Sequence, residues 1–196
     1  MDYEAFKDVL SRQRAIRLFD TSRDVDDATV EDLIRVATWA PNGGNRQGWR
    51  FIVIRNRDTR QKLGAIFDEL GRNRPDPAPE RTPWEDVPVL VAVCAAQTAG
   101  VNVEGQAEVG RTNTHASVYP AVQNFLLAAH AAGLGSVLTT RWMMRGDEVK
   151  SLLGIKDNEL EVMAILPLGW SDRKYGRGKR LPVSEVTYRE KAGQPW

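Results

Sequence analysis

The segment ATWAPNGGNRQGWRFIVI, residues 37–54, passes from a helical pattern through a polar turn into a strand pattern. Before it, apolar residues recur at positions i, i+3, i+4 and i+7: Val30, Leu33, Ile34 and Ala37. This spacing predicts an amphipathic helix that Asp26 or Asp27 caps and that ends before Pro41. After the turn, the run Arg50–Arg55 (RFIVIR) predicts a strand.

The rest of the chain alternates in the same way. Helical patterns cover Tyr3–Arg12, Thr59–Leu70, Ser117–Ala132 and Asp147–Leu153. Strand patterns cover Val89–Ala96, Gly135–Arg141, Glu161–Leu168 and Val183–Tyr188. Interleaved helices and strands predict an α/β or α+β fold in a single domain over residues 1–196, with a basic C-terminal extension from about residue 174.

Two segments stand out by their hydrophobicity. Val89–Ala96 (VLVAVCAA) is an unbroken apolar run, which is typical of a strand buried on both faces. The predicted helix Ser117–Ala132 is apolar nearly all round and ends at Gly133, which suits a C-cap. Such a helix lies in the centre of a protein or at a subunit interface. Residues 71–88, with five prolines, and the polar residues 97–116 predict surface excursions.

Composition excludes several classes of protein. With 42% hydrophobic residues, the chain is not a disordered tail, and 27 Lys plus Arg against 26 Asp plus Glu argue against a general nucleic-acid binder. One cysteine excludes an intrachain disulfide, and two histidines argue against a metal site. The N-terminus lacks the apolar region of a signal peptide, and no run reaches the roughly 18 apolar residues of a membrane span. A cytoplasmic protein is therefore expected.

Positive charge gathers near both ends of this nearly neutral chain. One cluster consists of Arg12, Arg14 and Arg17, and the other of Arg173, Lys174, Arg177, Lys179 and Arg180. Arginine forks suit a phosphate or another planar oxyanion. The alternative is two solvated surface patches. Contact with nucleic acid is disfavoured, because no aromatic residues interleave with the basic tail.

The turn within residues 37–54 carries Asn42, Asn45 and Gln47, whose side-chain amides each offer a donor and an acceptor. This set suits the edge of a flavin or a nucleobase, although an ordinary Asn/Gly turn has the same composition. The chain lacks a GxxxxGK[ST] loop, a GxGxxG turn and a GxSxG elbow. Cys94, His115 and His130 are interpreted as structural residues, so we expect a cofactor to carry the chemistry.

Four blocks together resemble the nitroreductase family of FMN-dependent oxidoreductases over residues 10–187. They are RAIRLF (14–19), residues 37–54, NFLLAAHAAGLGSV (124–137), and ILPLGW (165–170) followed by GKRLPVSEV (178–186). The resemblance implies an α+β fold in which helices flank a mostly antiparallel sheet. It also implies a homodimer with two FMN sites at the interface, a setting that suits the apolar helix 117–132.

The resemblance also implies the FMN contacts. Arg14 and Arg17 would hold the phosphate and the pyrimidine end of the ring, with Arg12 replacing the motif's first arginine because Gln13 occupies that place. The flavin would be lined by Asn42, Asn45 and Gln47, partly from the partner subunit. Its reactive nitrogen would be approached by Leu138, Thr139 and Thr140. The phosphate would be clamped by Lys179 and Arg180. The family commonly has Ser at positions 15 and 42 and Pro at 48, where this chain has Ala15, Asn42 and Gly48.

The implied reaction is a ping-pong hydride transfer. NAD(P)H would reduce the flavin, and a nitroaromatic, quinone or related conjugated acceptor would then take the electrons, with no catalytic side chain and no metal. The same scaffold hosts dehalogenases, flavin-destroying enzymes and dehydrogenases, and a non-catalytic flavin-binding protein is a further alternative. Candidate acceptor contacts lie in residues 71–88 and 97–116 and nearby, namely Trp84, Gln106, Arg111, Asn113 and Trp142.

Overall fold

The computed structural model describes all residues except 1, 73–78, 97–106, 157–158 and 174, as well as the side chains of 107–113. Four strands form one antiparallel sheet in the order β1-β2-β4-β3. Their bounds are β1 Trp49–Ile54, β2 Val89–Ala96, β3 Leu134–Ser136 and β4 Leu160–Trp170. Together with the helices, this arrangement makes the chain an α+β protein, as predicted.

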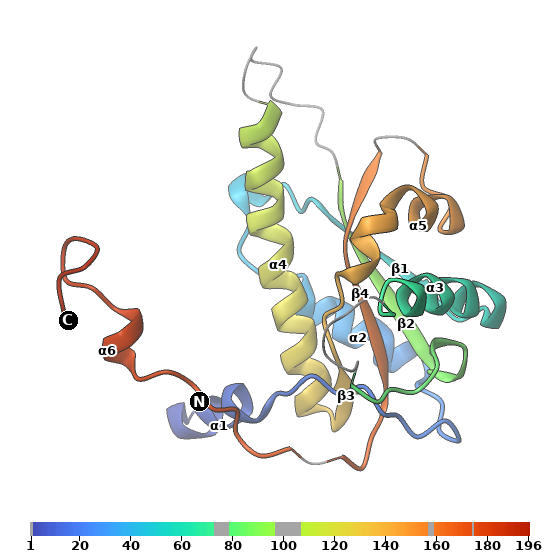
Figure 1. Ribbon diagram of the computed structural model, residues 1–196, viewed down its shortest axis with the longest axis horizontal. Helices are drawn as coiled ribbons and strands as arrows, with labels where there is room; N and C mark the ends of the chain where they lie inside the picture. Colours follow the sequence, from blue (N-terminus) through green and yellow to red (C-terminus); the bar gives the residue numbers. More distant parts are fainter. Residues whose placement is uncertain (1, 73–78, 97–106, 157–158, 174) are drawn as a thin grey trace.

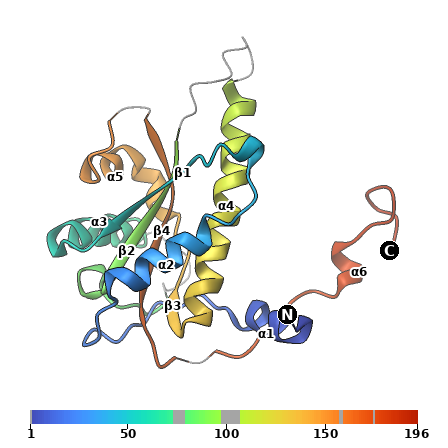
Figure 2. The ribbon, with the colours of Figure 1, turned by 180° about the vertical axis from the view of Figure 1, so that it is seen from behind.

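Helices cover both faces of the sheet (Figures 1 and 2). One face packs against α2 (Asp27–Ala37) and α4 (Ala107–Ala131), and the other against α3 (Arg57–Glu69) and α5 (Gly146–Leu152). Strand β2 contributes alternate residues to the two cores. Because side chains alternate across a strand, burial on both faces explains the unbroken apolar run of β2.

Local sequence rules account for the ends of several elements. The Asp26 carboxylate caps α2 by accepting a hydrogen bond from the Thr29 amide at 2.6 Å, and this bond is the largest cause of the lowered pKa of Asp26. At the other end of the core, Gly133 follows α4 with φ +80°, a left-handed conformation that favours glycine. Both features confirm the sequence prediction.

Three element predictions are wrong in extent or type. Helix α4 begins at Ala107, because polar residues within 107–116 form an additional length of helix rather than a loop. The predicted strand 135–141 is reduced to β3, after which Thr139 makes only an isolated bridge to Ile165 and the chain turns into the 3₁₀ helix η3 (Arg141–Arg145). Residues Val183–Val186 form a single helical turn, α6, rather than a strand.

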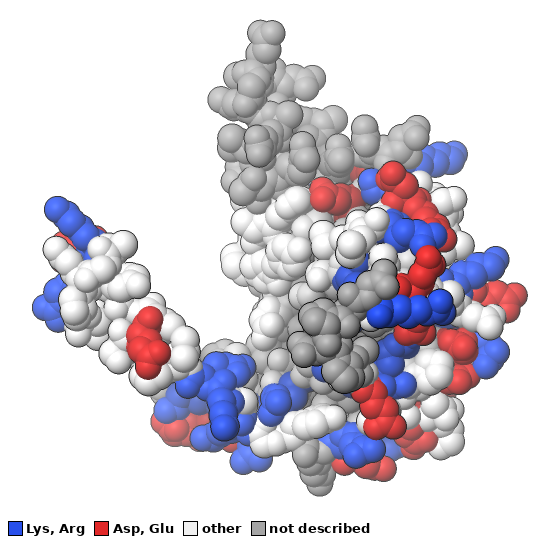
Figure 3. Space-filling view, viewed as in Figure 1, with Lys and Arg blue, Asp and Glu red and all other residues white. Residues whose placement is uncertain are grey.

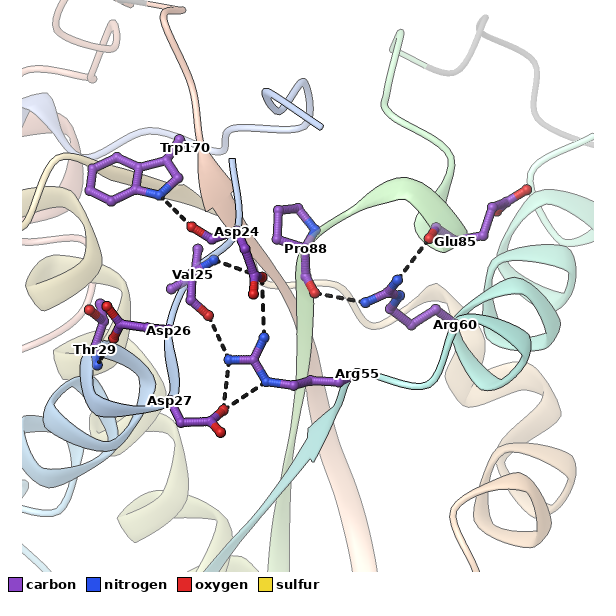
Figure 4. A network of polar contacts seen from close by, with 10 residues as sticks. All are labelled: Asp24, Val25, Asp26, Asp27, Thr29, Arg55, Arg60, Glu85, Pro88 and Trp170. Carbon is purple, nitrogen blue, oxygen red and sulfur yellow. Dashed lines mark hydrogen bonds and ion pairs between the residues drawn. The ribbon is translucent and has the colours of Figure 1, made fainter. Parts of the chain in front are cut away.

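A polar network joins the chain around residues 24–27 to the edges of the sheet (Figure 4). The Arg55 guanidinium donates to carboxylates of Asp24 and Asp27 at 3.2 and 2.8 Å and to the Val25 carbonyl. Arg60 donates to the carbonyls of Pro88 and Glu85 at 2.7 and 3.0 Å. These bonds join the loop before α2 to the end of β1 and the loop before β2 to helix α3 (Arg57–Glu69).

The N-terminal helix and the chain just after residue 174 lie beside each other, outside the layered body, whereas the C-terminus lies apart from both (Figure 1). Helix α1 (Tyr3–Arg12) has no buried residue, and the chain from residue 175 onward leads through α6 away from the sheet. We call residues 175–196 the C-terminal arm. In the part of the chain that the structure describes, no helix is long and apolar enough to cross a membrane.

Candidate functional site

A pocket of about 530 Å³ opens between the N-terminal segment, the end of α3 and the start of η3. Its described lining residues come from four separate parts of the chain: Arg17; Phe67, Asp68, Gly71 and Arg72; Pro79 and Arg81; and Leu138, Thr139, Thr140 and Arg141. Its volume lies within the range of small-molecule sites, about 300–1,000 Å³. Four of the residues implied by the family resemblance, Arg17, Leu138, Thr139 and Thr140, therefore meet in one cavity.

Arg17 reaches this pocket because its segment is attached to the sheet and to the loop before β2. The Ile16 amide donates to the Ser136 carbonyl at 3.1 Å, and the Thr82 amide donates to the Arg17 carbonyl at 2.9 Å. Gly135 permits the approach, since a Cβ atom there would lie 2.5 Å from Cγ2 of Ile16. The backbone on both sides of Arg17 is thus fixed, and the guanidinium itself donates to the Ala15 carbonyl at 3.2 Å.

Thr139 forms a rigid part of the pocket wall. Its amide donates to the Ile165 carbonyl and its carbonyl accepts from the Ile165 amide, both at 3.2 Å, while its hydroxyl donates to the Ile165 carbonyl at 2.6 Å. Buried Trp142 donates from its indole nitrogen to the Thr139 carbonyl at 2.9 Å. The Thr139 side chain therefore serves the fold, and Trp142 supports the wall from behind rather than lining the pocket.

Four side chains that the sequence analysis did not single out form another part of the lining. The Arg141 guanidinium lies 4.4 Å from the centre of the Phe67 ring and donates to the Phe67 carbonyl at 3.3 Å. Arg81 pairs with Asp68 and lies 5.3 Å from the same ring. The signal available in the sequence was weak, because Arg81 falls among the charges of the Pro-rich segment and Arg141 follows the strand pattern.

The expected acceptor contacts have different outcomes. Trp84 is buried, stacks on Phe67 at 4.8 Å between ring centroids and lines a small cavity that adjoins the pocket. Trp142 is the supporting residue described above. Gln106 and the side chains of Arg111 and Asn113 lie outside the described residues.

The two basic clusters contact each other through interactions within the chain, and their expected joint hold on a phosphate stays a prediction. The Arg14 guanidinium donates to the Gly176 carbonyl and lies 5.5 Å from the Tyr175 ring. Asp8 accepts from Arg12 at 2.7 Å and from Arg177 at 3.0 Å, and these two hydrogen bonds are the main causes of its lowered pKa. Arg12 is thus engaged with a carboxylate of its own helix.

The remaining expected contacts lie apart from the pocket of the same chain. Lys179 and Arg180 are exposed on the C-terminal arm, where Arg180 donates to the Lys179 carbonyl at 2.9 Å. Asn42 accepts from the Gln47 amide at 2.9 Å, and Asn45 and Gln47 adopt left-handed φ values of 52° and 50°. The turn packs near α4, since a Cβ at Gly48 would lie 3.2 Å from Thr114.

The residues interpreted as structural have structural surroundings. Cys94 is fully buried in β2, and burial raises the pKa of its thiol to about 12, so it stays protonated near neutral pH. His115 lies 2.9 Å from the Glu161 carboxylate and is partly buried. His130 is partly buried in α4. Among the described residues, no group of three or more His, Cys, Asp or Glu side chains is arranged to hold a metal.

The sheet order and the covering helices make this chain an α+β protein, and comparison with known proteins identifies its family. The family model for the nitroreductase family matches residues 10–170, so the chain belongs to the nitroreductase family. A protein of Archaeoglobus fulgidus named as a putative NADH dehydrogenase/NAD(P)H nitroreductase is 28% identical over an alignment that covers 85% of each chain.

Iodotyrosine deiodinases are also related. The protein from Hydra vulgaris is 28% identical over 90% of this chain, and the rat protein is 30% identical over 88% of it. The chain spans 70% and 64% of the lengths of these two relatives. A putative nitroreductase from Desulfovibrio desulfuricans, solved in complex with FMN, has the same fold, with a TM-score of 0.73 at 24% identity over 97% of this chain and 99% of that one.

Proposed function

We propose that this protein is an FMN-dependent oxidoreductase that uses NAD(P)H to reduce nitroaromatic, quinone or related conjugated acceptors. The observation that carries the proposal is the meeting of Arg17 with residues 138–140 in one pocket of a nitroreductase-family chain. Further support comes from the relatives named as putative NAD(P)H nitroreductases in Archaeoglobus fulgidus and Bacillus subtilis.

The chemistry of the pocket is suitable for a flavin. Thr139 supplies a wall held by three hydrogen bonds, and Arg17 supplies a positive charge on a fixed backbone. Arg17 would hold the pyrimidine edge, where its charge stabilises the anion that develops on reduction. Leu138 and Thr140 would present main-chain atoms on either side of Thr139. The phosphate would be held by Arg14, Lys179 and Arg180. Arg12 is fixed by its hydrogen bond to Asp8.

When bound, FMN supplies the hydride acceptance and donation that side chains lack. This chain's own residues bind and orient the ring and the two substrates that use it in turn. Titratable side chains are not required for the transfer, because water can deliver protons to the reduced acceptor. This division of work agrees with the structural surroundings of Cys94, His115 and His130.

A homodimer completes the proposed site. The C-terminal arm exposes apolar side chains beyond the body, with Leu181, Val183, Val186, Tyr188 and Trp196 each more than half exposed. Figure 3 shows that the surface over the middle of α4 is also uncharged. A second copy would cover both surfaces, and its Asn42, Asn45 and Gln47 would line the flavin site that the same chain's turn does not reach.

A second candidate reaction is the reductive removal of iodine from an aromatic ring. It is favoured by the related deiodinases of Hydra vulgaris and rat. In this reaction two electrons and a proton replace the carbon–iodine bond with carbon–hydrogen and release iodide. Iodide release from 3-iodotyrosine with dithionite as reductant would distinguish it from nitro or quinone reduction.

The first experiment is the visible spectrum of the purified protein, followed by turnover. We expect flavin absorption, released FMN, and oxidation of NADH or NADPH that depends on added menadione or 4-nitrobenzoate. Light scattering should give twice the chain mass of 21.9 kDa. A colourless protein that takes up no added FMN would overturn the proposal, and a flavoprotein with no acceptor-dependent turnover would leave the flavin-binding alternative.

A further inference from the structure

The turn between α2 and β1 contains a residue in an unusual backbone conformation. Gln47 has φ 50°, in the left-handed region, and Asn45 has φ 52°. Asparagine adopts this region more often than other residues with a Cβ atom, whereas a residue with a long side chain, such as glutamine, rarely does. The conformation of Gln47 therefore needs support from its surroundings.

Asn42 provides this support from the other end of the turn. Its carboxamide oxygen accepts a hydrogen bond from the Gln47 amide at 2.9 Å, across five residues of chain. Its carboxamide nitrogen donates to the Ala40 carbonyl at 3.4 Å. Because Ala40 is buried in the core, the Asn42 side chain joins Gln47 to a fixed part of the chain.

The chain after Gln47 is also fixed. The Arg50 guanidinium donates to the Gln47 carbonyl at 3.1 Å. The Gly48 carbonyl accepts from the Ala96 amide of β2 at 2.7 Å. Glycine at position 48 leaves the left-handed conformation open to Gln47, because a residue that precedes proline is restricted toward extended angles. Asn42 and Gly48, both departures from the family pattern, thus favour the same conformation of Gln47.

The side chains of Asn42 and Gln47 differ in their availability to a ligand. The Asn42 carboxamide is half-buried, and both its oxygen and its nitrogen make hydrogen bonds within the turn. The Gln47 side chain is exposed, and its carboxamide offers a donor and an acceptor, which suit the edge of a flavin. Because the backbone of Gln47 is already held, less conformational entropy is lost when this carboxamide binds.

We propose that Asn42 is a positioning residue, which holds Gln47 in the conformation that presents its carboxamide to the flavin. This inference rests on the proposed function, in which the turn of one copy reaches the flavin site of the other. It changes the role that the resemblance implies for Asn42, from a flavin contact to a residue that acts through Gln47. When the hydrogen bond is lost, the binding conformation is less populated, and the apparent dissociation constant for FMN rises by the same factor.

A double-mutant cycle separates positioning from direct contact. Asn42→Leu removes the acceptor and keeps a side chain of similar size, and it should raise the FMN dissociation constant roughly fivefold, which is the effect of one neutral hydrogen bond. Asn42→Asp keeps an acceptor oxygen and should restore most of the affinity at an ionic strength that screens its added charge. Gln47→Ala should also weaken FMN binding, and adding Asn42→Leu to it should have no further effect.

Amide hydrogen exchange in the full chain without added FMN reports on the turn directly. The Gln47 amide should exchange faster in Asn42→Leu than in wild-type protein, and Asn42→Asp should return it toward the wild-type rate, because an amide exchanges once its hydrogen bond opens. Asn56→Leu is the control, since it removes the bond from the Asn56 carboxamide oxygen to the Thr59 amide at the start of α3. This variant should leave the FMN dissociation constant and the exchange of the Gln47 amide unchanged.

Two results would overturn the inference. One is an FMN dissociation constant that Asn42→Leu does not change. The other is an equal loss of affinity from Asn42→Leu in the wild-type and Gln47→Ala backgrounds, which indicates direct contact between Asn42 and the flavin. Failure of the proposed function is a different result, because wild-type protein then binds no FMN, while amide exchange still shows whether Asn42 holds Gln47.

Discussion

Two arginine-rich regions of this molecule differ in the number of carboxylates that lie beside their arginines. Around Arg55, the carboxylates of Asp24 and Asp27 and the carbonyl of Val25 accept the guanidinium hydrogen bonds, and Arg57 pairs with Asp86 at 2.7 Å. In the pocket, four arginines face only Asp68 among the described lining residues. The first region is balanced within the chain (Figure 4), and the described lining of the second contains more arginines than carboxylates.

This difference separates a structural cluster from a candidate binding site more clearly than the number of arginines does. A charge that is paired and hydrogen-bonded in the folded chain contributes to holding loops together. A pocket with excess positive charge destabilises the fold slightly and attracts anions. Substitutions in the two regions should therefore change different measured quantities.

The largest effect is expected from removing the proposed phosphate contacts. Arg14→Ala combined with Arg180→Ala should weaken FMN binding at least about 100-fold, because two charge-assisted hydrogen bonds to a phosphate are lost. Retained flavin after dialysis measures the effect. Arg35→Ala with Lys62→Ala removes equal charge from exposed helical faces and serves as the control. A double variant that keeps its flavin would show that the two chain ends do not share an anion.

A smaller loss is expected where the pocket is joined to the sheet. Gly135→Ala places a methyl group against Ile16 and should cost about 1–3 kcal/mol of the free energy of unfolding, since the segment carrying Arg17 must move. Urea denaturation measures this, and flavin affinity should fall with it. Gly146→Ala is the matched control, because nothing lies within 4 Å of its Cβ and its backbone is helical. Equal stability of both variants would contradict the close packing.

The smallest effect belongs to the balanced cluster. Arg60→Met removes the bonds to Pro88 and Glu85 and should lower the free energy of unfolding by about 1–2 kcal/mol. Arg57→Met breaks only an exposed ion pair and should change it by less than about 0.5 kcal/mol. Flavin affinity should stay constant in both. A change in that affinity would show that the two regions are coupled.

Much of the fold follows from local rules. The apolar run 89–96 has the bounds of β2, and the Asp26 cap and the glycine after α4 stand where expected. The sequence predictions were wrong where hydrophobicity and polarity do not determine the secondary structure. Polar residues of 107–116 are helical because polarity indicates exposure and not the absence of a helix, and residues 137–141 leave the sheet although their composition suits a strand.

Only part of the candidate site could be predicted from the sequence. Family motifs pointed to Arg17 and to residues 138–140, and the structure brings these together. Arg72, Arg81 and Arg141 were missed because charged residues beside prolines have the same composition as a solvated loop. Their position opposite one carboxylate depends on α3, η3 and the loop before β2 meeting in space.

Periodicity, capping residues and hydrophobic runs are properties of neighbours along the chain, so the amino-acid sequence established the main helices and strands, the buried Cys94 and the family. Charge balance is a property of neighbours in space. Arg55 and Arg141 are the same residue type, and only packing gave one of them two carboxylates and the other an aromatic ring at the edge of a pocket. Side-chain energetics depend on such surroundings, and these exist only once distant segments have folded together.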